Sequence, residues 1–448
     1  MKFTYTTLRP IFRSFMFIFL SGWTFFSYAQ PANNSPYTRY GLGNLNGSPN
    51  VRSSGIGGLS VAIREDSIPF VVNFLNPASY TSIGFTAFDI GIYGNVATIS
   101  SSTAKEKVNR ANLSYFTFGM PITKWWGGAF GLREFSSVNY SVTNSIVDST
   151  SGYGNVDYKF EGNGGINQFF IGIGLKPYKN LSIGLNASYL FGKINRIQRV
   201  EFLDDKFFNL KSERYTTVGG FYVDYGLQYT QPIKNGKHVL TFGSTFAHPM
   251  KVRAKTTTFD RTYVLTTFNE DLYRDTIAFE KVVGSHITTP WKYGFGLTWR
   301  KGEKWLFGVE HSQELWSGYR DAYEKKDSLA DAWKTSAGVE FRPSAPYSKR
   351  GIGAYFARMH YRIGGYYAMS QYKVNGTQLP EYGITLGFGL PLRRTRATAN
   401  SYLQSMINLA VEWGQRGTTS KSLLLENYWN FKLGFTLNDR WFIKRKYD

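Results

Sequence analysis

The chain contains no cysteine among its 448 residues. Disulfide frameworks, cysteine-ligated zinc, iron–sulfur clusters and thiol nucleophiles are therefore excluded. After residue 30 the chain also lacks any run of about 20 apolar residues, so it is not a bundle of membrane-spanning helices. Glycine (46 residues) and aromatic side chains (17%) are abundant. A disordered basic chain would be poor in aromatic residues, so this composition favours a folded protein built from many short strands.

The N-terminus has the pattern of a secretory signal. Basic residues come first, an apolar stretch follows at 15–26, and small residues occupy positions 27 and 29. This order predicts a signal peptide over residues 1–29. The alternative is a single membrane anchor, but the apolar stretch is short for crossing a bilayer. We therefore expect an exported protein.

Beyond the signal, apolar residues recur with a period of two. Ile183 and Leu185, for example, alternate with Ser182 and Gly184. Such alternation predicts strands with one apolar face and one polar or small face. Fourteen segments show it: 86–99, 110–120, 127–142, 164–175, 181–195, 215–231, 238–252, 287–299, 305–319, 333–341, 352–368, 381–390, 402–414 and 428–438.

The connections between these segments fall into two alternating classes. Six are short and rich in Pro, Gly, Lys and Arg, whereas the intervening ones, such as 143–163 and 253–286, are mostly longer and polar. Outer-membrane barrels combine short periplasmic turns with longer extracellular loops. A soluble β-sandwich would share the strand pattern, but it needs neither an even strand count nor two classes of loop. The prediction is an all-β, transmembrane, antiparallel up-and-down β-barrel in the outer membrane of a Gram-negative bacterium.

Residues 30–85 precede the first predicted strand and are rich in turn-forming residues. A barrel of about fourteen strands is wide enough to need filling, so these residues are expected to form a lumenal plug. Three parts follow: a signal peptide at 1–29, a hatch at 30–85 and a barrel at 86–448.

Charged residues occur in the inward-facing register of the strands. Arg358, His360 and Arg362 are spaced by two, so they are expected to share one face of a strand and could bind a carboxylate. The alternative is a hydrated wall of salt bridges. On the last strand Leu433 should face lipid, and Gly434 should accept small polar residues. The full inward set is Asp89, Asp224, Lys292, Glu310, Glu340, Arg358, His360, Arg362, Glu412 and Lys432.

The net charge is +21, from 52 basic and 31 acidic residues. Many basic residues fall in predicted periplasmic turns, among them Lys234, Lys237 and Arg300. They could attract anionic headgroups or an acidic periplasmic partner. They could equally be ordinary interfacial side chains that extend toward water. No nucleic-acid motif is present, so no nucleic-acid partner is expected.

Two motifs and the strand count resemble one known family. A Gly-Gly-x-x-Val-Ala stretch begins at Gly57 and Gly58, and Asn76-Pro77-Ala78 stands shortly before the first strand. With fourteen strands after them, these motifs resemble the FadL-like outer-membrane long-chain fatty-acid transporters. The resemblance implies that both motifs belong to a lumenal hatch. It also implies an extracellular low-affinity groove and lateral release of a hydrophobic ligand at a kinked strand.

Two functions from different classes remain open. The first is a channel or transporter for hydrophobic, fatty-acid-like molecules, gated by the hatch. The second is an accessory or structural barrel in a multi-protein complex for type IX secretion or barrel assembly, since one fold serves several functions. The expected partners are outer-membrane lipid, a hydrophobic ligand, and other outer-membrane or periplasmic proteins. The five histidines are scattered without metal-ligand spacing, so no enzyme activity, metal or cofactor is expected.

Overall fold

A computed structural model describes the fold over most of the chain. The predicted signal peptide lies outside the described residues. None of the helices in the described part is long and apolar enough to span a membrane. The described residues are 35–45, 49–64, 70–148, 154–204, 206–268, 270–343, 351–392, 395–398 and 401–439.

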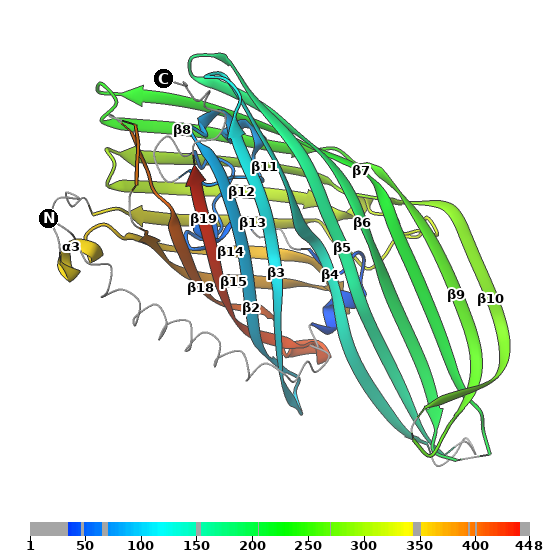
Figure 1. Cartoon of the computed structure of the whole chain (residues 1–448). Coiled ribbons are helices and arrows are strands. Elements are labelled where there is room, and N and C mark those ends of the chain that lie inside the picture. The colour runs from blue at the N-terminus through cyan, green and yellow to red at the C-terminus, as the bar shows by residue number, and fades with distance from the viewer. Residues whose placement is uncertain are drawn as a thin grey trace, which may run out of the picture.

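Antiparallel strands form a closed barrel of fourteen wall strands (Figure 1). Two of these wall strands each consist of two labelled strands in succession. One is formed by β8 followed by β9, and the next by β10 followed by β11. The first and last strands close the barrel, because β19 pairs with β2 from Leu425–Ser100 to Asp439–Thr86. The strands are β2 (Thr86–Ser100), β3 (Lys105–Pro121), β4 (Trp126–Asp148), β5 (Gly154–Tyr178), β6 (Leu181–Phe202), β7 (Asn209–Ile233), β8 (His238–Ala247), β9 (Lys251–Leu265), β10 (Asp271–Thr288), β11 (Trp291–Lys301), β12 (Trp305–Leu315), β13 (Ala332–Phe341), β14 (His360–Val374), β15 (Thr377–Pro391), β18 (Met406–Gly417) and β19 (Leu425–Asp439).

Short elements complete the described chain. Four lie before the barrel: η2 (Pro36–Arg39), β1 (Asn44–Leu45), α2 (Val51–Ser54) and η3 (Pro77–Ser82). The others lie between wall strands: η4 (Trp316–Gly318), α3 (Ile352–Phe356), the hairpin of β16 (Thr395–Thr398) and β17 (Ser401–Leu403), and η5 (Ser420–Ser422).

The predicted strand count is confirmed, but several predicted boundaries are wrong. The segment predicted as a strand from residue 352 begins with helix α3, and β14 starts at His360. The predicted loops 143–163 and 253–286 largely continue the strands β4, β5, β9 and β10. The outer parts of these strands have no uniformly apolar face. Apolar and polar residues therefore do not alternate strictly there, even though the backbone pairing continues.

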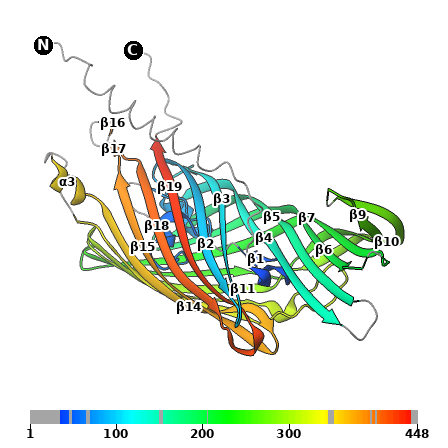
Figure 2. The same cartoon turned by 90° about the horizontal axis from the view of Figure 1, so that it is seen from below.

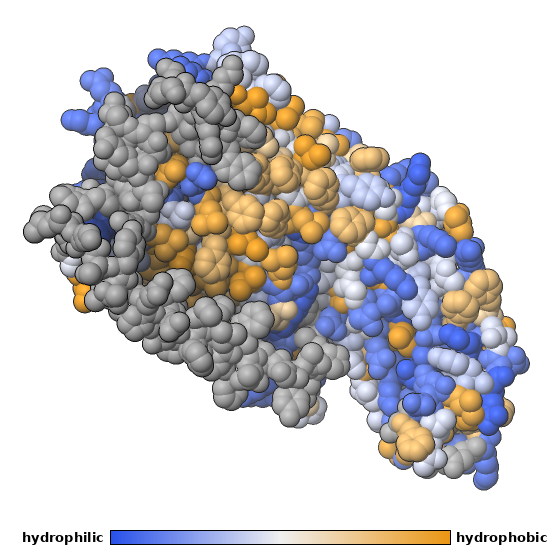
Figure 3. All heavy atoms as spheres, in the orientation of Figure 1, coloured by the Kyte–Doolittle hydropathy of each residue, from blue (hydrophilic) through white to orange (hydrophobic). Residues whose placement is uncertain are grey.

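The outward face of the wall changes character along each strand. On β6, Tyr189 and Phe191 are 42% and 38% exposed, and the next outward residue is the exposed Lys193. Figure 3 shows the result: an apolar band covers the barrel wall, whereas the far part of the long strands is mostly hydrophilic. A lipid-facing band of this kind is what an outer-membrane barrel requires. The protein is therefore an outer-membrane barrel whose hydrophilic part lies outside the bilayer.

The hydrophilic part is a six-stranded sheet that projects beyond the band (Figures 1 and 2). Long connections of outer-membrane barrels lie on the extracellular side, so this sheet faces the cell exterior. We call it the outer sheet. It comprises residues 139–148 of β4, 154–164 of β5, 193–202 of β6 and 209–219 of β7, together with β9 and β10.

A charge placed on the lipid-facing wall should destabilise the barrel. Leu433 lies near the middle of β19, opposite Leu409 of β18 and Ile92 of β2. We expect Leu433→Arg to lower the free energy of unfolding by about 2–4 kcal/mol, measured by urea denaturation in lipid vesicles. Ser145→Arg, on the exposed outer part of β4, is the matched control and should change it by less than about 0.5 kcal/mol. If both substitutions lowered the free energy of unfolding equally, the assigned membrane band would be contradicted.

Gly434 has less free space beside it than its expected tolerance of small polar residues requires. This residue faces the lumen, where a Cβ would lie 2.9 Å from Cβ of Val51. A serine there would press against the N-terminal segment, so the lumen position is tightly packed.

Candidate functional site in the lumen

The N-terminal segment, described over residues 35–45, 49–64 and 70–83, lies inside the barrel with its backbone against the wall. We call it the inner segment. A Cβ at Gly338 of β13 would lie 2.6 Å from the carbonyl oxygen of Ile56. A Cβ at Gly174 of β5 would lie 2.7 Å from the carbonyl oxygen of Pro77. Real Cβ atoms do not approach so closely, so glycine at these wall positions allows the two backbones to touch.

The predicted hatch residues Asn76, Pro77 and Ala78 form the start of helix η3. The Oδ1 atom of Asn76 accepts a hydrogen bond from the Ala78 amide at 3.1 Å, and proline occupies the first helical position. The Nδ2 atom of Asn76 donates to the carbonyl oxygens of Val61 at 2.6 Å and of Leu227 at 3.3 Å. Asn76 therefore caps the helix and also joins it to another part of the inner segment and to strand β7.

The predicted hatch residues Gly57 and Gly58 form a turn with positive φ angles of 73° and 86°. Glycine adopts such angles without strain. The Gly57 amide donates to Oγ1 of Thr385 on β15 at 2.7 Å. The turn thus connects the inner segment to the wall on the side of β13 to β15.

A cluster of buried charges lies between the inner segment and the wall. Glu340 of β13 is fully buried, and its carboxylate accepts from Nε of Arg362 at 2.7 Å and Nε of Arg52 at 3.2 Å. Arg342 also pairs with it, and Nδ1 of His360 lies 3.7 Å away. Arg52, which belongs to the inner segment, was not identified from the sequence. It stands 288 residues before its partner, so no local pattern connects the two.

The three residues predicted to bind a carboxylate do not share one strand. His360 and Arg362 lie on β14, but Arg358 precedes the strand, next to helix α3, so that part of the expectation is wrong. The Nη1 atom of Arg362 donates to Oδ1 of Asn408 at 2.9 Å, in addition to its pair with Glu340. The carboxylate beside His360 and Arg362 is thus the chain's own. Binding of a ligand there stays a prediction.

Three cavities of about 280, 130 and 110 Å³ lie among the inner segment and the wall. The largest contains the ion pairs Arg416–Glu381 (2.8 Å) and Lys432–Glu412 (3.6 Å). Polar surroundings of this kind suit water and charged groups better than hydrocarbon. Seven charged side chains line this cavity: Lys292, Lys334, Lys432, Glu314, Glu381, Glu412 and Arg416. The predicted inward set contained Lys292, Lys432 and Glu412 and missed the rest, although they too face the lumen.

The wall is interrupted between β3 and β4. The two strands pair from Pro121–Gly127 to Tyr115–Arg133 and no further, although both continue outward. Beyond this point strand β1 of the inner segment pairs with β4 at Leu45–Ser136 and Asn44–Ser137. Side chains also bridge the seam: Arg110 donates to Glu134 and, at 2.7 Å, to Oγ of Ser137. The 130 Å³ cavity includes Arg110 in its lining.

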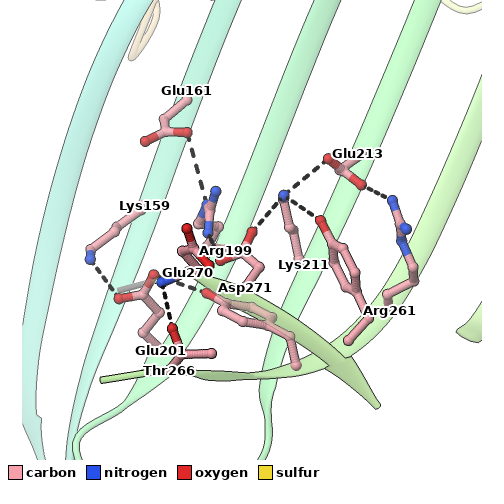
Figure 4. Close-up of polar contacts among 12 residues, drawn as sticks. Lys159, Glu161, Arg199, Glu201, Lys211, Glu213, Arg261, Thr266, Glu270 and Asp271 are labelled. Atoms are coloured by element: carbon pink, nitrogen blue, oxygen red, sulfur yellow. Dashed lines mark hydrogen bonds and ion pairs between the residues drawn. The ribbon is translucent and has the colours of Figure 1, made fainter. Parts of the chain in front are cut away.

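On the outer sheet, the tip of the β9–β10 hairpin folds over β6 and β7 (Figure 4). Asp271, at the start of β10, accepts from Nη1 of Arg199 at 2.7 Å and from Nζ of Lys211 at 2.8 Å. Lys211 also contacts Glu213 at 3.1 Å, and Arg261 pairs with the same carboxylate. These ion pairs fix the hairpin tip to the sheet.

The hairpin should be held at neutral pH and released in acid. Burial alone would raise the pKa of Asp271, but the hydrogen bonds from Lys211 and Arg199 outweigh it and hold that pKa below its ordinary value. For Glu213, burial is likewise outweighed by Lys211, so its pKa is lowered. Groups with lowered pKa values stabilise the fold above their ordinary pKa and lose this effect as the pH falls through the folded value.

We therefore expect a spin label at the exposed Phe268→Cys, in a chain without other cysteines, to keep constant mobility from about pH 8 to pH 5. Its mobility should rise below about pH 4. When Asp271→Asn is added to this variant, the label should be mobile at every pH in this range. Release already between pH 7 and pH 5 would contradict the assigned ion pairs.

Metal binding has no support in the described part of the chain, where no group of three or more His, Asp or Glu side chains is placed to hold an ion.

Solved structures of similar fold include proteins described as a hydrocarbon channel, a toluene transporter and a FadL homologue. A Pseudomonas putida toluene transporter, TodX, is 13% identical with a TM-score of 0.55 and covers 88% of this chain and 99% of its own. The CymD monoaromatic hydrocarbon channel is 11% identical with a TM-score of 0.53, covering 88% and 98%. A Pseudomonas aeruginosa FadL homologue is 10% identical with a TM-score of 0.53, covering 87% and 98%. At these identities the likeness shows the shared barrel fold.

A comparison with curated proteins finds no match. One family model, described as BamG, matches residues 11–448, which is nearly the whole chain. The predicted resemblance to the FadL-like barrels is confirmed in the fold, and by sequence the chain belongs to the BamG family.

Proposed function

We propose that this protein is a closed outer-membrane barrel that serves as an accessory subunit of a larger outer-membrane assembly. One observation carries the proposal: lumenal charged groups hold the chain's own inner segment. Glu340 pairs with Arg52, as described above. Glu310 of β12 accepts from the amides of Ser60 at 2.7 Å and Val61 at 2.8 Å. Groups that could select a solute are thereby used to hold residues 49–64 in place.

The inner segment would act as a permanent plug in this proposal. The backbone contacts at wall glycines and the buried charges both resist its withdrawal, because moving it would take Arg52 away from the buried Glu340 and the donating amides of Ser60 and Val61 away from Glu310. The part left free to act on other molecules is then the outer surface, above all the outer sheet.

Transport of hydrophobic small molecules is the second candidate function. The seam between β3 and β4 favours it, since a ligand could leave sideways where backbone pairing stops. The channels with the same barrel fold, described as carrying toluene or monoaromatic hydrocarbons, agree with it. In this case the inner segment would be a gate, and His360 and Arg362 would be candidate contacts for the carboxylate of a fatty acid.

Ligand binding separates the two candidates. The purified barrel would be titrated with radiolabelled oleate and with toluene. An accessory subunit is expected to show no saturable uptake of either compound beyond that of vesicles alone. Saturable oleate binding that Arg362→Met weakens, while Lys301→Met at an exposed position leaves it unchanged, would favour transport instead.

A further inference from the structure

Strand β10 is the outermost strand of the outer sheet (Figure 1). It pairs with β9 from Asp271–Leu265 to Thr288–Lys251, and three bulges interrupt the ladder, at Tyr273–Asp275, Thr276–Ala278 and Val282–Ser285. In the described residues, no residue-by-residue pairing with another strand runs along its opposite edge; a single bridge joins Thr288 to Arg320. Between the bulges this edge carries backbone amide and carbonyl groups that can pair with a further strand, and the longest regular stretch is Ala278–Val282.

The position beside β10 continues the path of a wall strand. Lower in the wall, β12 pairs with β11 as far as Leu315–Trp291. After Leu315 the chain turns inward, and Trp316 and Tyr319 are both only 3% exposed. In the described residues, β12 therefore does not continue beside β10, and the position next to β10 in the sheet has no regular strand. A strand added along β10 would extend the same sheet in the same direction.

Apolar side chains project from β10 although it lies outside the membrane band. Ile277, Phe279 and Val283 are 61%, 58% and 66% exposed. Soluble surfaces that expose several large apolar residues together commonly mark protein–protein contacts. Charges of both signs flank them, at Arg274, Asp275, Glu280 and Lys281, and such charges discourage unspecific pairing of an exposed edge.

A second copy of the chain does not fit this edge. Copies in one membrane are related by a two-fold axis along the membrane normal. Strand β10 runs from the outer hairpin tip back toward the membrane, so that axis would place the two β10 strands parallel. Identical backbone groups would then face each other, with donor against donor and acceptor against acceptor. Antiparallel self-pairing would need an axis across the strands, which the membrane forbids. The edge therefore suits an extended segment of a different protein.

We propose that the free edge of β10, residues 271–287, binds an extended segment of another cell-surface protein as an added β-strand. This inference rests on the proposed function as a subunit, and β10 would be the surface that contacts the other protein. Backbone hydrogen bonds along the regular stretch would supply the affinity, and apolar side chains of the partner strand would contact Phe279 and, at the neighbouring bulge, Ile277.

Hydrogen exchange tests the added strand. The assembly extracted in mild detergent and the isolated barrel would be exchanged in parallel and analysed by mass spectrometry. Amides of β10 whose N–H points away from β9 should exchange quickly in the isolated barrel and become protected in the assembly. The central strand β6, which is paired on both sides, is the internal control and should be equally protected in both samples.

A pair of surface variants gives a second readout on a folded protein. Ile277→Lys with Phe279→Lys should reduce retention of the partner roughly tenfold, the scale of losing a central apolar contact. Val147→Lys, 77% exposed on β4, should leave it unchanged. Partner retention with unprotected β10 amides would overturn the inference and leave the subunit function standing. A barrel that retains no partner at all would overturn both.

Discussion

Replacing Glu340 by glutamine is expected to lower the free energy of unfolding by about 3–5 kcal/mol, because removing one partner of a buried charge cluster leaves the others uncompensated. Glutamine keeps the shape of the side chain and removes its charge. Arg52 and Arg362 are 3% and 1% exposed at their side chains, so water cannot replace the lost carboxylate. Urea denaturation in lipid vesicles would measure the change.

Two companion variants show whether the effect comes from the buried charges. Glu303→Gln lies in an exposed turn and should cost less than about 0.5 kcal/mol. Adding Arg52→Met to Glu340→Gln should recover part of the loss, since one unpaired charge is removed with the other. A cost below about 1 kcal/mol for Glu340→Gln would mean that the cluster is hydrated and that it does not hold the inner segment.

Deletion of residues 40–75 should open a barrel that is otherwise closed. The deleted stretch includes Arg52, the turn at Gly57 and most of the backbone contacts with the wall. The strands close through the pairing of β19 with β2, so the barrel should still assemble. A lumen of this width without its filling should conduct ions. Planar-bilayer recordings are expected to change from background for the whole chain to resolvable single-channel currents for the deletion.

Heat-dependent mobility in electrophoresis would first establish that the shortened barrel is folded. A shortened barrel that is folded yet still sealed would contradict the role of the inner segment as the plug. Residues 30–85 would then be better explained as an arm that binds a periplasmic protein.

The barrel could be predicted from the sequence because lipid imposes a uniform demand on every wall strand. Residues such as Ile183 and Leu185 must be apolar wherever the outward face meets hydrocarbon, and this repeats fourteen times. The outer sheet could not be predicted in the same way. Residues 193–202 of β6 meet water and ion pairs on the outward face, so the alternation fades while the hydrogen-bonded ladder continues.

The candidate site was predicted only in part. Asn76 and Gly57 carry local signals, a helix cap before proline and a turn that needs glycine, and both were identified. The pairing of Arg52 with Glu340 depends on how the inner segment lies in the closed barrel. No spacing along the chain encodes that arrangement, so the inward register could identify Glu340 and Arg362 but not Arg52.

Extraction in mild detergent followed by native mass spectrometry tests the central claim most directly. The account predicts that the 50.9 kDa chain, shortened by removal of its signal peptide, leaves the membrane in a complex of larger mass with other proteins in fixed proportion. The complex should survive without any added hydrophobic compound. A lone barrel that carries a stoichiometric hydrophobic molecule would contradict the subunit function and establish transport in its place.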